Sequence, residues 1–196
     1  MAKGKKNLGE MSTAELGLLF PVNIVNYRKE WPVLYSEEER RIFEAIGEDY
    51  IIIVEHIGST AVPGLGAKPT IDILLEVRRD TPDEHIKDRM ALAGYEFISK
   101  PENPPPHMMF AKGYSAEGIT GNTFHVHARY PGNREEVVFR DYLVKHGEVA
   151  DEYLELKKKL ALEFRNDREK YTEAKTGFIK SVLARAYGQK EQSESF

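Results

Sequence analysis

The 196-residue chain has no cysteine and no apolar run long enough to cross a membrane. Without cysteine it forms neither disulfides nor thiolate metal sites, which suits a reducing cytosol. Its net charge of −4 argues against a nucleic-acid-binding protein that works by bulk electrostatics. Residues 1–7 form a segment with three lysines, and this segment is not followed by the apolar stretch of a secretory signal. We therefore expect a cytoplasmic protein without a membrane or nucleic-acid partner.

Hydrophobic residues make up 41% of the chain, which is enough for a packed core. The length favours a single domain, which we place at residues 12–187. A flexible N-terminus (1–11) and a flexible tail (188–196) are expected on either side of it. Ser12–Glu15 and Ser36–Glu39 each pair a serine with a glutamate three residues later, so both predict a capping box that starts a helix.

Hydrophobic periodicity predicts an α+β domain, because short β-branched runs alternate with segments of helical spacing. Buried strands are expected at 51–54 and 71–77, and a further strand at 95–99. Two paired strands, 107–112 and 123–130, are expected around Gly118 and Gly121. Helices are expected from Ser36 to Gly47 and over 83–93, 135–146, 149–165 and 170–187, and the prolines between 101 and 106 predict a loop. This order predicts a mixed sheet with packed helices and a helical C-terminal third.

The sequence Gly58-Ser59-Thr60, at the end of an apolar run, is the first candidate site. A turn after a strand presents unpaired backbone N–H groups that can hold an anion, and the two hydroxyl groups add donors. Lys68, in the loop that follows, can reach the same phosphate as a point charge. The alternative is an ordinary turn between a strand and a loop.

Asp72 is the second candidate, because a carboxylate in so apolar a run needs a partner. On a strand it shares a face with Leu74 and Glu76, while the residues between them face the other way. Such a carboxylate can ligate Mg²⁺ together with a substrate phosphate, with Glu76 in support. The alternative is an aspartate that accepts hydrogen bonds from loop amides.

His125-Val126-His127 is the third candidate, since strand alternation points both imidazoles to one face with Arg129 next along it. The histidines can share a metal ion or contact a phosphate, and Arg129 can bind the phosphate too. Convergence of the pair with Asp72 would give a mixed donor set that suits Mn²⁺ or Zn²⁺. The alternative is a structural histidine pair on a half-exposed strand.

The sequence does not assign a single role to the remaining charged residues. Glu55 and His56 end the first strand on opposite faces, so one of them points toward the site. Lys175 lies near apolar residues and can extend into solvent or dock toward the pocket. The charged face of the late helices is expected to be a solvated surface, made by Arg134, Arg140, Lys145, Lys157, Lys158 and Lys159.

The chain resembles the GrpB family over about residues 12–187. The resemblance rests on the block from Glu55 to Leu65, on Lys68-Pro69, on Ile71-Asp72-Ile73 and on His125-Val126-His127. It continues through Phe139–Leu143, His146, Tyr153, Leu156-Lys157, Tyr171, Lys175 and Phe178-Ile179.

This resemblance implies a nucleotidyltransferase-like fold of the polymerase-β type. In that superfamily a Gly-Ser turn precedes a strand with an acid-x-acid pair, and a later strand brings a further acid. The acids hold two metal ions that activate a hydroxyl group and stabilise the leaving pyrophosphate. Gly58 and Ser59 match the turn and Asp72 matches the first acid, but Leu74 stands at the second acid position. Histidines stand on the strand where the further acid is expected.

Two functions are predicted from these observations. One is a nucleotidyltransferase that carries a nucleotidyl group from a nucleoside triphosphate to a small acceptor. It would use a divalent metal, Mg²⁺ or Mn²⁺ ahead of Zn²⁺, held by Asp72, His125 and His127. The other is a catalytically silent module that binds a nucleotide or phosphometabolite, with a link to coenzyme A metabolism through family members fused to dephospho-CoA kinase. A one-metal hydrolase built on the same three residues is a third alternative.

Overall fold

A five-stranded mixed sheet forms the centre of the computed structural model, which describes residues 8–99 and 107–193. The strands are β1 (Ile51–Ile57), β2 (Thr70–Val77), β3 (Glu96–Ile98), β4 (Met108–Ser115) and β5 (Gly118–Arg129), in the order β1-β2-β5-β4-β3. β2 and β5 run parallel, whereas the other three pairings are antiparallel. The predicted α+β class with a mixed sheet is therefore confirmed.

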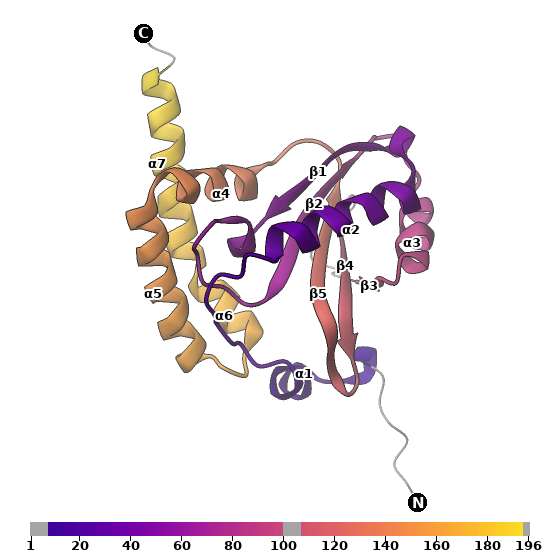
Figure 1. Cartoon of the computed structure of the whole chain (residues 1–196), viewed down its shortest axis with the longest axis horizontal. Helices are drawn as coiled ribbons and strands as arrows, with labels where there is room; N and C mark the ends of the chain where they lie inside the picture. Colours follow the sequence, from indigo (N-terminus) through magenta and orange to yellow (C-terminus); the bar gives the residue numbers. More distant parts are fainter. Residues whose placement is uncertain (1–7, 100–106, 194–196) are drawn as a thin grey trace, which may run out of the picture.

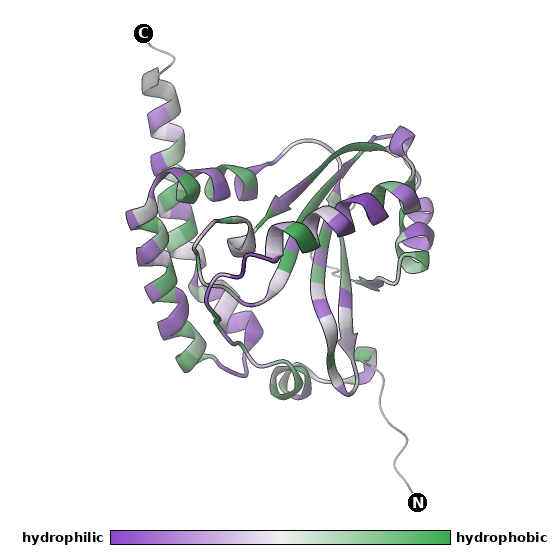
Figure 2. Cartoon of the chain, in the orientation of Figure 1, coloured by the Kyte–Doolittle hydropathy of each residue, from purple (hydrophilic) through white to green (hydrophobic). Residues whose placement is uncertain are grey.

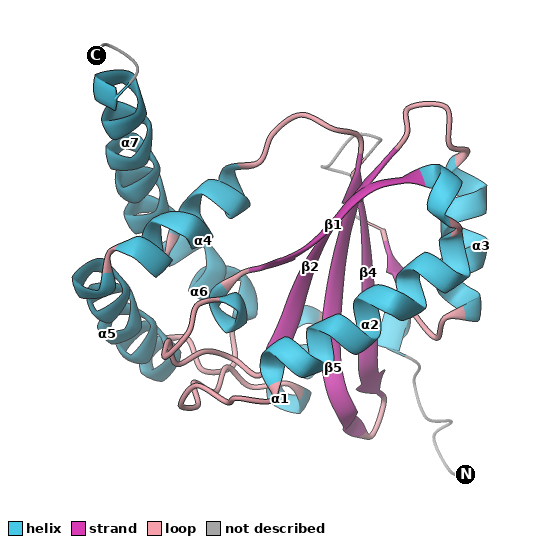
Figure 3. Ribbon diagram, turned by 45° about the horizontal axis from the view of Figure 1, so that its top comes forward, coloured by secondary structure: helices cyan, strands magenta, loops and turns pink. Residues whose placement is uncertain are grey.

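Helices pack on the sheet and dominate the C-terminal third, as predicted. They are α1 (Thr13–Leu19), α2 (Trp31–Ile46), α3 (Asp83–Leu92), α4 (Glu135–Lys145), α5 (Gly147–Glu163), α6 (Arg168–Ala174) and α7 (Thr176–Ser193). α2 crosses one face of the sheet with α3 beside it, whereas α4–α7 gather on the opposite side of the molecule (Figure 1; Figure 3). No helix in the described ranges combines the length and apolarity that a bilayer span requires.

The largest core lies between the sheet and the pair α2 and α3. Ile73 and Leu75 of β2 are fully buried against this face, where they meet Trp31 and Ile42 of α2. The apolar colour along the middle of β2 follows this burial (Figure 2). Because strand residues alternate, Asp72 and its same-face neighbours are directed to the other side of the sheet, which α4 covers in part.

Two element predictions fail at the N-terminal half. The Ser12–Glu15 capping box is confirmed, but α2 begins at Trp31 with Pro32 in its first turn, so Ser36 lies inside the helix. Proline suits the first turn of a helix because its φ is already helical and it has no N–H group there that would need a partner. Residues 51–54 form part of an edge strand in which Val54 is buried and Ile52 is exposed, so the expectation of a buried strand is wrong.

The C-terminal half also departs from the predicted boundaries. The β4–β5 hairpin turns at residues 116–117, and Gly118 and Gly121 lie within β5 at positive φ. The predicted helix 170–187 is divided at Lys175 into α6 and α7, and α7 continues past residue 188 to Ser193. The predicted proline loop lies outside the described residues, as do residues 1–7 and 194–196.

Candidate functional site

The parallel pairing of β2 and β5 brings Asp72 together with both histidines. Asp72 lies opposite His125 in the register and Leu74 lies opposite His127, so all four side chains leave one face of the sheet. Nδ1 of His125 is 3.3 Å from Oδ1 of Asp72, and Nε2 of His127 is 3.9 Å from the same oxygen. The three predicted site residues therefore converge, although the segments that carry them lie about fifty positions apart in the chain.

The contacts of Asp72 fix its charge. Burial would raise the pKa of this carboxyl group, but hydrogen bonds and charges from His125 and His127 outweigh it and hold the pKa well below its usual range. Burial lowers the pKa of His125, and the hydrogen bond and charge of Asp72 oppose this shift. A neutral ring that donates from Nδ1 to Asp72 can accept at Nε2 from the hydroxyl group of Tyr114, which lies 3.0 Å away.

Gly58 allows the Gly58-Ser59 turn to lie directly against Asp72. Its φ is +73°, and a Cβ atom at this position would be 2.6 Å from Oδ2 of Asp72. A side chain would therefore meet both an unfavourable backbone conformation and a clash. The turn continues into the short 3₁₀ helix Ser59–Ala61. This placement of a Gly-Ser turn beside the acid-bearing strand is the one that the resemblance implied.

Thr60 supports the turn from within the protein. It is buried, and its hydroxyl group contacts Nε2 of His56 at 3.0 Å and donates to the carbonyl oxygen of Thr70 at 3.2 Å. Its predicted role as a phosphate ligand would require it to give up these contacts. His56 stacks on the ring of Tyr35 with 4.8 Å between the centroids, and burial lowers its pKa to about 4.

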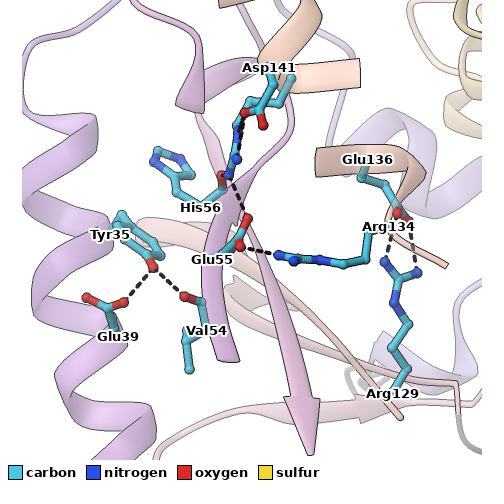
Figure 4. Close-up of polar contacts among 10 residues, drawn as sticks. Tyr35, Glu39, Val54, Glu55, His56, Arg129, Arg134, Glu136 and Asp141 are labelled. Carbon is cyan, nitrogen blue, oxygen red and sulfur yellow. Dashed lines mark hydrogen bonds and ion pairs between the residues drawn. The ribbon is translucent and has the colours of Figure 1, made fainter. Parts of the chain in front are cut away.

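Ion pairs attach the beginning of α4 to the sheet (Figure 4). The carboxylate of Glu55 contacts Arg134 and lies 3.1 Å from Nη1 of Arg140, which also donates to the carbonyl oxygen of His56 at 2.8 Å. Glu55 shares the sheet face of Asp72 but is committed to these arginines. The expectation that Arg134 and Arg140 form a solvated surface is therefore wrong.

Arg129 and Glu76 lie farther along the same face. Arg129 is only 6% exposed and binds Glu136 through two hydrogen bonds of 2.7 and 3.1 Å, so its predicted phosphate contact would need this pair to open. Glu76 lies opposite Arg129 in the register and is 4% exposed. Its Oε1 atom has no hydrogen-bond partner within the part of the chain described.

Two lysines meet at one aromatic ring near the start of β2. Nζ of Lys68 lies 5.4 Å from the ring centroid of Tyr171, and Nζ of Lys175 lies 4.5 Å from the same centroid. Both side chains are half-buried. Neither ammonium group forms an ion pair with a carboxylate among the side chains that the structure describes. Lys175 thus docks toward the interior, which was one of its two predicted positions.

Lys157 adds a third cation to this region. It was expected on a solvated surface but is 2% exposed, and its Nζ donates to the carbonyl oxygen of Gly66 at 2.5 Å. Burial, followed by repulsion from Lys175 and Lys68, lowers the pKa of Lys157 to about 7. We define the lysine cluster as Lys68, Lys157 and Lys175.

The electrostatics of the lysine cluster favour an anion. Burial, followed by repulsion from Arg168 and Lys175, lowers the pKa of Lys68 to about 8. Burial also lowers the pKa of Lys175, and the carboxylate of Asp72 opposes the shift of both lysines. Asp72 is therefore in electrostatic range of the cluster, but its single charge does not balance the cations.

Several residues of this region were not predicted as part of a site. Tyr153 belongs to it, because burial raises its pKa and a hydrogen bond with Ser59 opposes the rise. Tyr153, Tyr171 and Lys157 were already among the residues that carry the family resemblance, which was the available signal. Tyr114 had none, because its position depends on the strand irregularity at Gly113, where φ is +90°.

The donor set does not fit a centre of two divalent ions. Leu74, at the second acid position, is fully buried and packs with Ile57 and Val137, so apolar contacts fill the place of a carboxylate. Asp72 is left as the carboxylate between two imidazoles. Within the described residues, no group of three or more histidine, aspartate or glutamate side chains is arranged to hold a metal ion. The requirement for a divalent cofactor stays a prediction.

Comparison with known proteins shows the family. The model of the GrpB protein family matches residues 21–185. The chain belongs to the GrpB family. A crystal structure of the conserved protein GrpB from Enterococcus faecalis superposes with a TM-score of 0.73 at 29% identity, over 85% of this chain and 98% of that one.

Two curated relatives are about twice as long as the part that matches this chain. UPF0157 protein YqkA of Bacillus subtilis is 35% identical over 164 residues, which are 82% of this chain and 46% of that protein. A dephospho-CoA kinase of Mycolicibacterium paratuberculosis is 25% identical over 85% of this chain and 46% of the kinase. The chain thus spans about half the length of these two relatives. The similarity to the kinase agrees with the expectation that some members of the family are fused to dephospho-CoA kinase.

Proposed function

We propose that this GrpB protein binds a ligand with two or more phosphate groups, such as a nucleoside triphosphate, at the lysine cluster and the Gly58-Ser59 turn. The observation that carries the proposal is the pair of half-buried ammonium groups of Lys68 and Lys175, which share the Tyr171 ring without a carboxylate partner among the described residues. Burying unpaired like charges is costly, and an anionic ligand would supply the missing counter-charges.

A phosphate fits this site better than a carboxylate. The Gly58-Ser59 turn offers backbone N–H groups, and Ser59 offers a hydroxyl group. The cations beside it come from the loop before β2, from α5 and from the junction of α6 and α7. Several cations around one anion suit a group with several negative oxygens, which pyrophosphate and triphosphate supply. The name of the dephospho-CoA kinase relative makes coenzyme A a further ligand to be compared.

Isothermal titration calorimetry tests the binding proposal with pyrophosphate, four nucleoside triphosphates and coenzyme A. We expect Lys68→Met and Lys175→Met each to weaken the preferred ligand at least tenfold, which is about 1.4 kcal/mol. Lys180→Met is the matched control, because Lys180 is an exposed lysine on α7. The proposal would be contradicted if none of these ligands bound the unmodified protein. It would also be contradicted if Lys180→Met lost as much affinity as the two other variants.

Nucleotidyl transfer is a second candidate function, favoured by the position of His127. Its side chain is 39% exposed, and Nε2 lies 3.9 Å from Oδ1 of Asp72 on the face that leads to the lysine cluster. In this reaction the oxygen of an acceptor hydroxyl group attacks the α-phosphorus, and the bond from phosphorus to the bridging oxygen breaks. Pyrophosphate leaves toward the lysines and the hydroxyl proton passes to His127.

Release of pyrophosphate from nucleoside triphosphates, measured with and without added divalent ions, tests this second function. We expect turnover that falls at least a hundredfold in Asp72→Asn and His127→Ala while calorimetric binding of the nucleotide persists. No release above these variants under any condition would dismiss transfer and leave the binding function in place.

A further inference from the structure

A pocket lies on the open face of the sheet, farther along β5 than His125. It has a volume of about 140 Å³ and is lined by His127, Arg129 and Glu136 together with His107 and Met109. β5 carries His125 beside Asp72, then His127, then Arg129, so His127 contacts Asp72 and also lines the pocket. One imidazole therefore stands between the proposed phosphate site and this pocket.

We propose that the pocket binds the acceptor of the transfer reaction, and that this acceptor is a small amine-bearing alcohol rather than an anion or a macromolecule. The inference rests on the proposed nucleotidyl transfer. Its geometric basis is the shared residue His127: a molecule in the pocket presents its hydroxyl group to the imidazole, on the opposite side from the nucleotide phosphates.

The size of the pocket limits the acceptor. A volume of about 140 Å³ accommodates a compact metabolite of a few non-hydrogen atoms. The wall formed by Met109 is flexible and apolar, so it can adapt to the carbon skeleton of such a compound.

The exposed edge of Glu136 offers the pocket a hydrogen-bond acceptor. Burial would raise the pKa of Glu136, but hydrogen bonds from Arg129 outweigh it and lower the pKa, so the group is a carboxylate at neutral pH. The Glu136 side chain is 43% exposed, which leaves part of the carboxylate open to a ligand. A carboxylate accepts hydrogen bonds and favours a cation, so an ammonium group of the acceptor is expected to bind Glu136.

The floor of the pocket is polar and incompletely paired. Both nitrogens at the tip of Arg129 bind Glu136, but its Nε atom is buried with no hydrogen-bond partner within the described residues. An unpaired buried donor is unfavourable. Because Glu136 holds both terminal nitrogens of Arg129, a ligand would meet the exposed edge of that carboxylate without opening the pair.

Saturation-transfer NMR on the full chain tests the inference with ethanolamine, glycerol and glycerol 3-phosphate as probes. We expect ethanolamine to bind with at least tenfold preference over glycerol 3-phosphate. Glu136→Gln should remove that preference, and Met109→Trp, which fills the pocket, should abolish binding of ethanolamine. Leu92→Trp is the control, because Leu92 is 79% exposed on α3 and does not line the pocket.

Pyrophosphate titration of each variant separates this inference from the proposed function and checks that the variant is folded. Unchanged pyrophosphate affinity together with lost ethanolamine binding in Met109→Trp supports an acceptor pocket. Ethanolamine that binds Met109→Trp and Leu92→Trp equally, or no binding by any probe, overturns the inference while phosphate binding stands. Nucleotides that fail to bind while ethanolamine does bind overturn both the proposed function and the acceptor role.

Discussion

The arginines that join α4 to the sheet and the lysines near the start of β2 are buried or partly buried cations with opposite surroundings. Arg129 and Arg140 each contact a glutamate within 3.1 Å. Lys68 and Lys175 meet an aromatic ring instead and have no carboxylate partner among the described residues. Cations with an internal partner hold the fold together, whereas we propose that the cations without one bind a ligand.

The side-chain chemistry agrees with this division. The guanidinium group of Arg129 forms two parallel hydrogen bonds to one carboxylate, which fixes the first turn of α4 to β5. An ammonium group such as that of Lys68 is a compact charge on a flexible stem, and it can turn toward an incoming phosphate without the loss of a directed pair. Variants that change stability in one region and ligand binding in the other test whether the two regions differ in this way.

The largest effect is expected where the turn of the phosphate site meets Asp72. Gly58→Ala forces a positive φ on alanine and places Cβ 2.6 Å from Oδ2 of Asp72. Strain and overpacking together should lower the free energy of unfolding by about 3 kcal/mol. Urea denaturation measures this loss. Gly64→Ala is the control, because φ is +81° there but nothing lies within 4 Å; a loss as large as that of Gly58→Ala would show that the contact with Asp72 is unimportant.

Anion binding should stabilise the lysine region in a pH-dependent manner. At a hundredfold excess over Kd, pyrophosphate should raise the free energy of unfolding by about 2.7 kcal/mol at pH 7. Lys68 has a pKa of about 8 and must be protonated to bind the anion, so the stabilisation should shrink as the pH rises from 7 to 9.5. Thermal unfolding with and without pyrophosphate measures the difference. If the stabilisation were constant across this pH range, pyrophosphate binding would not depend on the protonation of Lys68.

Removing a partner from the arginine region should affect stability and leave binding unchanged. Glu55→Gln deprives Arg134 and Arg140 of their shared carboxylate. Because the residues are partly exposed, we expect a loss of about 1.5–2 kcal/mol in urea denaturation. Pyrophosphate affinity should stay within twofold of the unmodified protein. A tenfold change in that affinity would mean that the two regions are coupled and that the comparison is wrong.

The smallest effect is expected from His56, which supports the turn. Burial lowers its pKa to about 4, below the ordinary value near 6.5. The folded state favours the neutral ring, so its contribution is complete above pH 6.5 and is lost as the pH falls toward 4. After allowance for partial exposure we expect about 1 kcal/mol of acid destabilisation, seen in thermal unfolding, that disappears in His56→Gln. If the variant lost as much stability in acid as the unmodified protein, the loss would come from other titrating groups.

The sequence predicted the residues that local patterns determine. Strand alternation placed Asp72 with Leu74 and Glu76, and His125 with His127 and Arg129, on single faces, and the register confirms both sets. Their convergence depends on the parallel pairing of β2 with β5. Pairing between segments so distant in the chain is not encoded in the local pattern of either strand.

Of the lysine cluster, Lys68 was predicted as a phosphate ligand and docking of Lys175 was one of its two predicted positions, but Lys157 was not predicted, because its partner comes from a distant part of the chain. Lys157 has a helical charge pattern that indicates a solvated face, but the loop at Gly66 covers it and accepts its hydrogen bond. Gly66 itself has room only for hydrogen, since a Cβ there would lie 2.9 Å from the carbonyl oxygen of Val25. Likewise, Arg140 was expected on a solvated surface but pairs with Glu55, because α4 packs against β1. Charge patterns identify cations, and only tertiary packing decides their partners.

Thermal unfolding of the double variant Lys68→Met/Lys175→Met, with and without pyrophosphate, tests the division between paired and unpaired cations most directly. Without ligand the variant should unfold at the same temperature as the unmodified protein or a higher one, because the buried repulsion is removed, and pyrophosphate should no longer raise that temperature. A variant that is strongly destabilised without ligand, or that pyrophosphate still stabilises fully, would contradict the assignment of these lysines to a phosphate ligand.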